Sequence, residues 1–92
     1  MKVSHGIGAV EMVAALEQAG LRSTRPRSAI IDQIAEWATK GKDFSSEELW
    51  HATQARAPWI GRATVFRTVE LLTALNFLDR ITFADGSERY HP

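Results

Sequence analysis

The segment 62–75 carries residues whose types and spacing could bind a ligand. On a helical wheel of about 100° per residue, Val65, Val69 and Leu72 fall on one side and form a core face. The opposite side combines arginines, a small residue and an aromatic ring: Arg62, Ala63, Phe66, Arg67 and Glu70. An aromatic ring on a predicted solvent face between arginines is uncommon, although single exposed hydrophobic residues are normal.

The chemistry of this face suits the major groove of DNA, which a recognition helix enters with its N-terminal turns. Arg67 could form two hydrogen bonds with a guanine, and Phe66 could contact a thymine methyl group. Gly61 and Ala63 would allow close approach, and Thr64 or a free N–H group could hold a phosphate. The alternative is that Phe66 packs against a neighbouring element and the arginines are merely solvated.

A second basic cluster lies earlier in the chain. Arg22, Arg25 and Arg27 fall within six residues that contain no acid, and Thr24 lies among them. These residues could form an arm that touches phosphates or enters the minor groove. They could equally be a solvated loop with a helix cap. We therefore count Arg22, Thr24 and Arg27, together with Arg62, as candidate DNA contacts.

The composition limits the functional classes. The chain has 92 residues, 11 basic and 11 acidic side chains, and a net charge of zero. Because the charges are segregated, a local positive surface remains compatible with that neutral total. The absence of cysteine excludes disulfides, thiolate metal sites and a cysteine nucleophile. With no membrane span, secretion signal or catalytic motif, we expect a cytoplasmic protein that is not an enzyme.

Local signals predict four helices and then a hairpin, after a disordered segment 1–6. Thr24 and Pro26 mark one helix start, because threonine caps free N–H groups and proline is tolerated in a first turn. Ser45 and Glu48 have the spacing of a capping box. Asp85-Gly86 is a strong turn signal. The helices are expected over about 8–19, 24–40, 45–57 and 61–75, with strands over 78–83 and 88–91.

Apolar spacing indicates which faces are buried. In the first helix, Val13 and Leu16 repeat at helical spacing, with Val10 beside them. In the first strand, Ile81 and Phe83 alternate with polar residues. An isolated hairpin is unstable, so it must pack on the helices. The order predicts one domain over 1–92, mainly α with a small β-hairpin: a winged helix-turn-helix with three to four helices and a two-stranded wing.

The stretch from about Ala15 to His91 resembles the N-terminal domain of the ferric uptake regulator (Fur) family. Four segments in consistent order carry the resemblance: the entry to the second helix (19–27), the capped third helix (44–50), the recognition helix (60–69) and the wing with its second strand (85–90). Each segment is weak evidence alone. Together they are fairly specific and cover most of the chain.

The resemblance implies a metal- or redox-responsive transcription repressor that binds an A·T-rich palindrome in double-stranded DNA. It implies that Arg22 reaches the minor groove and that Arg27 supports contacts with the DNA backbone. Thr64, Phe66 and Arg67 would face the major groove. A full-length protein would be a homodimer, whereas this chain alone would be a monomer or a weak dimer.

Two departures from the family pattern matter. Phe66 stands where the family usually has tyrosine, so a phenolic hydroxyl contact is missing and base preference there could rest on apolar contact instead. Family members also continue into a second domain that dimerises and holds most metal ligands. This chain ends at Pro92, where that domain would begin, so it is either a shortened member or part of a longer protein.

The histidines offer few metal ligands. His5, His51 and His91 form no close pair at ligand spacing. The resemblance implies that His91 contributes to a sensory site between domains, and Asp43 lies where some members supply a ligand. Because a closed site needs about four ligands, we expect no tight metal binding by this chain alone. A divalent metal (Fe, Zn or Mn) is implied for the full-length family protein.

Two functional hypotheses follow. The first is sequence-specific DNA binding through the fourth helix, based on the segregated arginines, the helical wheel and the resemblance. The alternative is a winged-helix module that binds a protein partner, based on the neutral net charge and the exposed position predicted for Phe66. Salt separates them, because DNA binding weakens steeply as salt rises.

Overall fold

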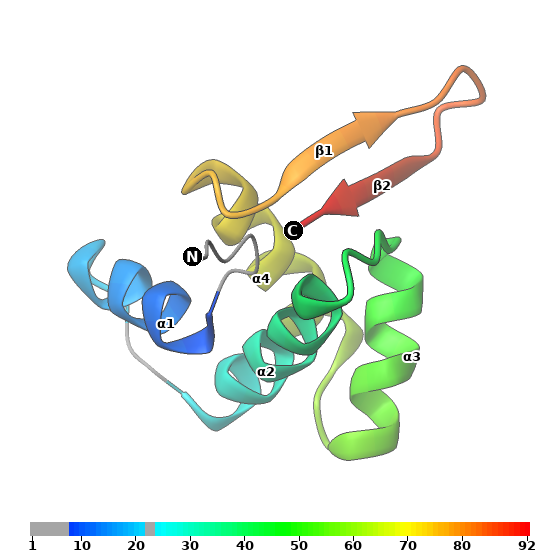
Figure 1. Ribbon diagram of the computed structural model, residues 1–92. Helices are drawn as coiled ribbons and strands as arrows, with labels where there is room; N and C mark the ends of the chain where they lie inside the picture. Colours follow the sequence, from blue (N-terminus) through cyan, green and yellow to red (C-terminus); the bar gives the residue numbers. More distant parts are fainter. Residues whose placement is uncertain (1–7, 22–23) are drawn as a thin grey trace.

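The computed structural model describes residues 8–21 and 24–92. The expectation of disorder over 1–6 therefore lies outside the described residues. Four helices precede a two-stranded antiparallel sheet (Figure 1). The elements are α1 (Ala9–Gln18), α2 (Arg25–Thr39), α3 (Ser46–Arg56), α4 (Arg62–Ala74), β1 (Asp79–Thr82) and β2 (Glu88–His91). This order confirms the predicted mainly helical fold with a small hairpin.

The helix starts form as their sequences predict. The Thr24 hydroxyl accepts a hydrogen bond from the Arg27 N–H at 3.3 Å. At α3, the Glu48 N–H donates to the Ser45 hydroxyl at 3.1 Å, and the Ser45 N–H donates to the Glu48 carboxylate at 3.2 Å. Both halves of the capping box are thus present. These caps satisfy N–H groups that have no partner within their own helix.

The chain reverses direction where left-handed backbone is tolerated. Asn76 ends α4 with a φ of 67°, a conformation that asparagine adopts more readily than most residues. In the hairpin turn, Gly86 has a φ of 87° and the Asp85 carboxylate accepts from the Ser87 N–H at 2.9 Å. The strands then pair Arg80 with Tyr90. The Asp85-Gly86 signal therefore identified the turn correctly.

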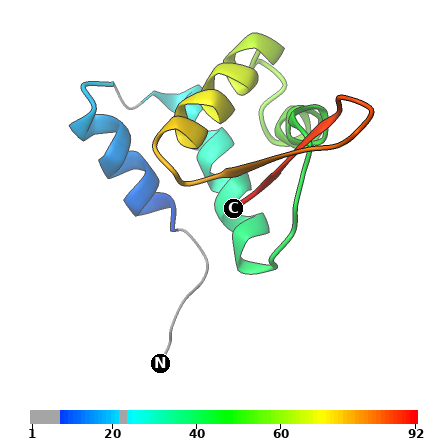
Figure 2. The same ribbon diagram turned by 90° about the horizontal axis from the view of Figure 1, so that it is seen from above.

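Helix α2 is the centre of the core, since it contacts α1, α3 and α4 (Figures 1 and 2). Viewed from above, α1 lies to one side of α2, α4 crosses over α2, and α3 is seen almost end-on beside the hairpin. The side chains that meet in the core come from every helix and from the hairpin: Met12, Leu16, Ile30, Ile31, Ile34, Phe44, Leu49, Val65, Val69, Leu72, Leu78 and Tyr90. Burial of this surface is the main force that holds α4 in place.

The apolar residues whose spacing indicated α1 and β1 are not all buried. Val10, grouped with Leu16 by its spacing, is 79% exposed, while Met12 is fully buried. In the hairpin, Ile81 and Phe83 are exposed, and the buried side chain is Tyr90 of the opposite strand.

Phe44 anchors the hairpin to the helices, which the sequence patterns did not indicate. Its N–H donates to the Tyr90 carbonyl at 3.0 Å, and the Tyr90 N–H donates to the Phe44 carbonyl at 2.7 Å. The Phe44 ring also contacts Trp37 and Tyr90, with centroid distances of 5.3 and 6.0 Å. A one-residue bridge to the α2–α3 loop therefore extends the small sheet and sets the position of the wing beside α3 and α4.

None of the helices in the described ranges has the length and apolar character needed to cross a membrane.

Candidate nucleic-acid interface

The N-terminal end of α4 is open to solvent. Gly61 precedes the helix in an extended conformation, and no side chain caps this end. Gly61 and Ala63 are exposed and carry little or no side chain. The first N–H groups of a helix have no partner within the helix, and the helix dipole favours negative charge there. This end of α4 can therefore approach an anionic surface closely.

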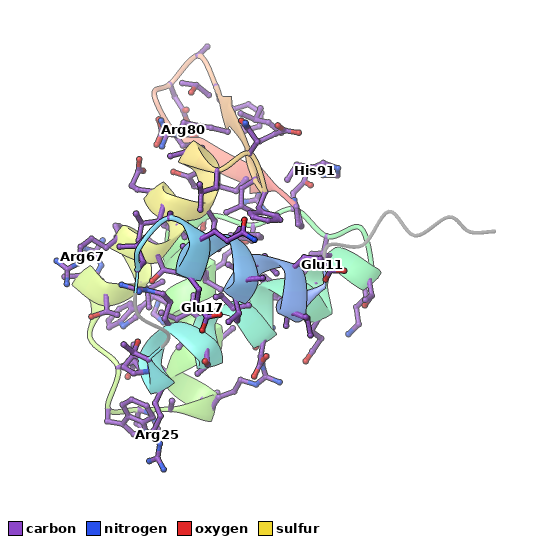
Figure 3. All side chains as sticks on the ribbon, turned by 90° about the vertical axis from the view of Figure 1, so that its left-hand side faces the viewer. Glu11, Glu17, Arg25, Arg67, Arg80 and His91 are labelled. Atoms are coloured by element: carbon purple, nitrogen blue, oxygen red, sulfur yellow. The ribbon has the colours of Figure 1, made fainter. Side chains whose placement is uncertain are left out.

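Arg67 is the most accessible of the candidate base-reading residues. It is exposed, and within residues 8–21 and 24–92 it has no hydrogen bond or ion pair. Figure 3 shows its side chain pointing away from the body of the protein. A guanidinium in this position keeps all its donors available for a base edge or a phosphate.

Phe66 lies next to Arg67 but is less exposed than its place on the wheel predicts. It is half-buried and packs against the core cluster. The guanidinium carbon of Arg62, one helical turn earlier, lies 4.3 Å from the centre of the Phe66 ring. The ring is therefore shared between the core and the surface, and only part of it can meet a ligand.

Arg62 is engaged within the protein. Its side chain donates to both carboxylate oxygens of Glu47, and the shortest of these contacts is 2.6 Å. These hydrogen bonds lower the pKa of the Glu47 carboxyl below its ordinary value, so the pair stays ionised. The structure thus joins the α4 start to α3 through an ion pair that sequence reasoning missed, because the two residues are 15 positions apart.

Thr64 has a partly structural environment. It is half-buried, and its carbonyl accepts a hydrogen bond from the Thr68 hydroxyl at 2.8 Å. Its N–H bonds back to the Gly61 carbonyl at 3.2 Å. The Thr64 hydroxyl is the part of the residue left for a phosphate contact.

The second basic cluster is described in part. Arg22 lies outside the described residues. Thr24 and Arg27 are half-buried at the start of α2, where the Thr24 hydroxyl already accepts from the Arg27 N–H. Arg25 is exposed, and Figure 3 shows its side chain directed outward at the α2 start. Arg25 belongs to the basic run but is not one of the candidate contacts predicted from the sequence. Because it is exposed, it is more accessible to a ligand than the half-buried Arg27.

A groove of about 920 Å³ separates the α4 start from the wing. Its walls come from the start of α3, the outer face of α4 and the hairpin: Ser45, Ser46, Glu47, Arg62, Ala63, Phe66, Arg67, Glu70, Gly86, Ser87, Glu88 and Tyr90. Three of these residues are acidic, so the groove itself is not a positive channel. The positive charge available to a ligand is concentrated at Arg67.

The candidate metal ligand His91 meets Asp43, although 48 positions separate them. The His91 Nδ1 lies 2.5 Å from an Asp43 carboxylate oxygen. In the described part of the chain, no group of three or more His, Cys, Asp or Glu side chains could hold a metal ion. The pair supplies one nitrogen and one oxygen donor, so it does not by itself fit a closed metal site. Figure 3 shows His91 and Arg67 on opposite sides of the molecule.

The comparisons with known proteins identify the family. The family model described as "Ferric uptake regulator family" matches residues 18–92. This chain belongs to the ferric uptake regulator family. The resemblance found in the sequence is thereby confirmed. Members of this family are transcription regulators and not enzymes, in agreement with the expectation for this chain.

Individual relatives of this chain agree with the family assignment. The ferric uptake regulation protein of Bacillus subtilis (strain 168) is 36% identical over 75 residues, which cover 82% of this chain and 49% of that protein. The peroxide-responsive repressor PerR of Staphylococcus aureus (strain Mu50) is 28% identical over 80 residues, or 87% of this chain and 52% of PerR. The chain thus spans about half the length of the curated relatives it matches.

Among solved structures, a manganese uptake regulator superposes with a TM-score of 0.72 and 26% identity, covering 97% of this chain and 60% of that one. The ferric uptake regulator of Helicobacter pylori has a TM-score of 0.73 at 18% identity, covering 98% of this chain and 59% of that one. These likenesses confirm the winged helix-turn-helix fold.

Proposed function

We propose that this chain is the DNA-binding domain of a metal-responsive transcription repressor and that it reads an A·T-rich palindrome with α4. The observation that carries the proposal is the exposed, unpaired Arg67 on the outward face of α4, beside the half-buried Phe66 and the open helix start. Arg67 supplies hydrogen bonds to a base, and Phe66 supplies an apolar edge for a thymine methyl group.

The proposal assigns supporting roles to the remaining candidates. Thr64 and the free N–H groups at the α4 start bind one phosphate. Arg27 and Thr24 contact the backbone beside it, and Arg22 enters the minor groove. These contacts fix the register of the domain on the duplex and carry little sequence information of their own.

The full-length protein is proposed to act in the cytoplasm as a homodimer that responds to a divalent metal. Support comes from relatives whose names include ferric and manganese uptake regulators, and from a zinc-bound manganese uptake regulator with 29% identity. His91 and Asp43 would contribute two donors to a site that other residues complete. Since the isolated domain lacks the avidity of two linked heads, its affinity for DNA should be modest.

Fluorescence anisotropy with two labelled duplexes tests the proposal. One duplex is an A·T-rich palindrome, chosen from a random pool by its binding to this chain, and the other has the same bases shuffled. Arg67→Ala should reduce the preference for the palindrome by about 5- to 150-fold, the worth of about 1 to 3 kcal/mol for a bidentate base contact. Equal binding of both duplexes by the unaltered chain would contradict the proposal.

Lys40→Ala is the matched control. Lys40 directly follows α2, and its side chain is 64% exposed and lies 3.9 Å from the Glu36 carboxylate. The substitution removes the same charge just after the C-terminal end of α2, and Figure 2 shows that this end of α2 lies away from the start of α4. The preference should stay unchanged in this variant.

Protein binding remains the second candidate because the groove beside α4 is lined by three acidic residues and the net charge is zero. Binding of a protein partner would survive a rise in salt that releases DNA. Partner capture from a lysate at high salt, with no preference between the duplexes at low salt, would favour this second function.

A further inference from the structure

Arg62 stands at the first position of α4, where a cation would ordinarily be assigned to a phosphate. Its Nε and Nη2 atoms instead donate to both carboxylate oxygens of Glu47, at 2.6 to 3.2 Å. Its guanidinium lies over the Phe66 ring at 4.3 Å and near the Trp50 ring at 5.9 Å. One side chain is thus held by a carboxylate and by an aromatic ring at the same time.

This geometry opposes a role as a phosphate ligand. A two-point contact between a planar guanidinium and a carboxylate is among the stronger polar contacts in proteins, and it restricts the orientation of both groups. To reach a phosphate, Arg62 would have to leave Glu47, which would remain as an unpaired anion next to the DNA. Arg62 would exchange the Glu47 carboxylate for a phosphate, and the unpaired carboxylate would repel the DNA backbone.

The same geometry favours a role in holding Phe66. The ring is half-buried and packs against the core cluster, and the Arg62 guanidinium carbon lies 4.3 Å from its centre. Glu47, Arg62 and Phe66 all line the groove beside the proposed base-reading face. Displacement of the guanidinium would free the ring to move into that groove.

We propose that Arg62, held by Glu47, is a positioning residue that fixes the Phe66 ring for base reading and makes no phosphate contact itself. The proposal deepens the proposed function and rests on it. Glu47 has a double effect in this scheme: it orients Arg62, and it cancels a charge that would otherwise strengthen binding to any DNA sequence.

The two possible roles of Arg62 predict different salt dependence. Each phosphate contact adds about 0.9 to the slope of log affinity against log salt. The double variant Glu47→Gln/Arg62→Gln removes both charges of the pair and leaves no unpaired carboxylate beside the DNA. In this variant, a lost phosphate contact would lower the slope by that amount. A lost positioning contact would leave the slope unchanged and reduce the preference for the palindrome. A cation–π contact at an exposed site corresponds to a fold-change of about 2 to 5, which is the expected loss of preference.

Glu47→Gln tests the other partner. The released Arg62 can then bind phosphate, so binding to the shuffled duplex should tighten at low salt and its salt slope should rise by about 0.9. The preference should fall as in the double variant. Glu36→Gln is the matched control, since Glu36 is 47% exposed and pairs with Arg56 at 3.2 Å, while Glu47 is 48% exposed. Glu36→Gln changes the net charge by the same amount. It should change the salt slope and the preference for the palindrome less than Glu47→Gln does.

Arg62→Lys separates position from charge. Lysine keeps the positive charge but lacks the planar fork, so the preference should fall about as far as in the double variant. Circular dichroism of each variant confirms that it is folded before binding is measured. Full preference in Arg62→Lys, or a lower salt slope in the double variant Glu47→Gln/Arg62→Gln, would overturn the proposal.

The outcomes also separate this inference from the proposed function. If the unaltered chain prefers the palindrome and Glu47→Gln behaves like Glu36→Gln, the positioning role is wrong while the DNA-binding function stands. If the unaltered chain binds both duplexes equally, or neither at low salt, the function and the positioning role both fail.

Discussion

Phe44→Ala tests whether the wing depends on a single anchor. The Phe44 side chain is fully buried, and its ring lies between those of Trp37 and Tyr90. Its backbone also forms both hydrogen bonds of the bridge to Tyr90. Because alanine keeps the backbone and removes the ring, this variant isolates the contribution of packing to the position of the hairpin.

The expected loss of stability is large for a chain of this size. Truncation of a buried phenylalanine to alanine costs about 3 to 5 kcal/mol, as the transfer energy and the cavity add together. Small domains have total stabilities of about 5 to 15 kcal/mol. At about 4 to 8 °C per kcal/mol for a domain of this size, the midpoint of thermal unfolding should fall by at least about 12 °C.

Thermal and urea unfolding followed by circular dichroism measure this loss. Phe83→Ala is the control, since Phe83 lies in the same wing and is 47% exposed. It should change the free energy of unfolding by less than about 0.5 kcal/mol. A loss below about 1 kcal/mol in Phe44→Ala, or equal losses in both variants, would refute the role of Phe44 as the anchor.

Two further predictions concern acid and metal. Hydrogen bonds from Arg89 lower the pKa of the Glu48 carboxyl. The ionised group should therefore stabilise the fold at pH values above the ordinary glutamate pKa. This contribution should be lost as the pH falls through the lowered pKa of Glu48. Urea midpoints between about pH 5 and pH 3 should fall less steeply in Glu48→Gln, which keeps the capping box, and an unchanged slope would count against the assignment. Calorimetry with zinc or manganese should detect no stoichiometric, submicromolar site on the 92-residue chain, because His91 and Asp43 supply only two donors; such a site would contradict the expectation.

The helix starts and the hairpin turn could be predicted from the sequence because each depends on residues close together in the chain. Ser45 and Glu48 satisfy each other across three positions, and Gly86 can adopt its left-handed conformation without a steric penalty. The outward direction of Arg67 was also predictable, since helical periodicity follows from backbone geometry alone.

The contacts that give the candidate site its character could not be predicted in this way. The pairing of Arg62 with Glu47 and the meeting of His91 with Asp43 depend on how distant segments pack. Periodicity places Arg62 on the solvent face but gives no sign of which group it meets there. The half-burial of Phe66 has the same origin, because another residue's side chain covers the ring.

The distribution of ion pairs explains how a neutral chain can still present a positive surface. Four arginines each pair with a glutamate, so that their charges cancel within the protein's own ion pairs: Arg56, Arg62, Arg80 and Arg89. In the described part of the chain, Arg25 and Arg67 are exposed and have no such partner. If base reading draws on so few cations, specificity should depend on the position of Phe66 and Arg67 rather than on the total charge.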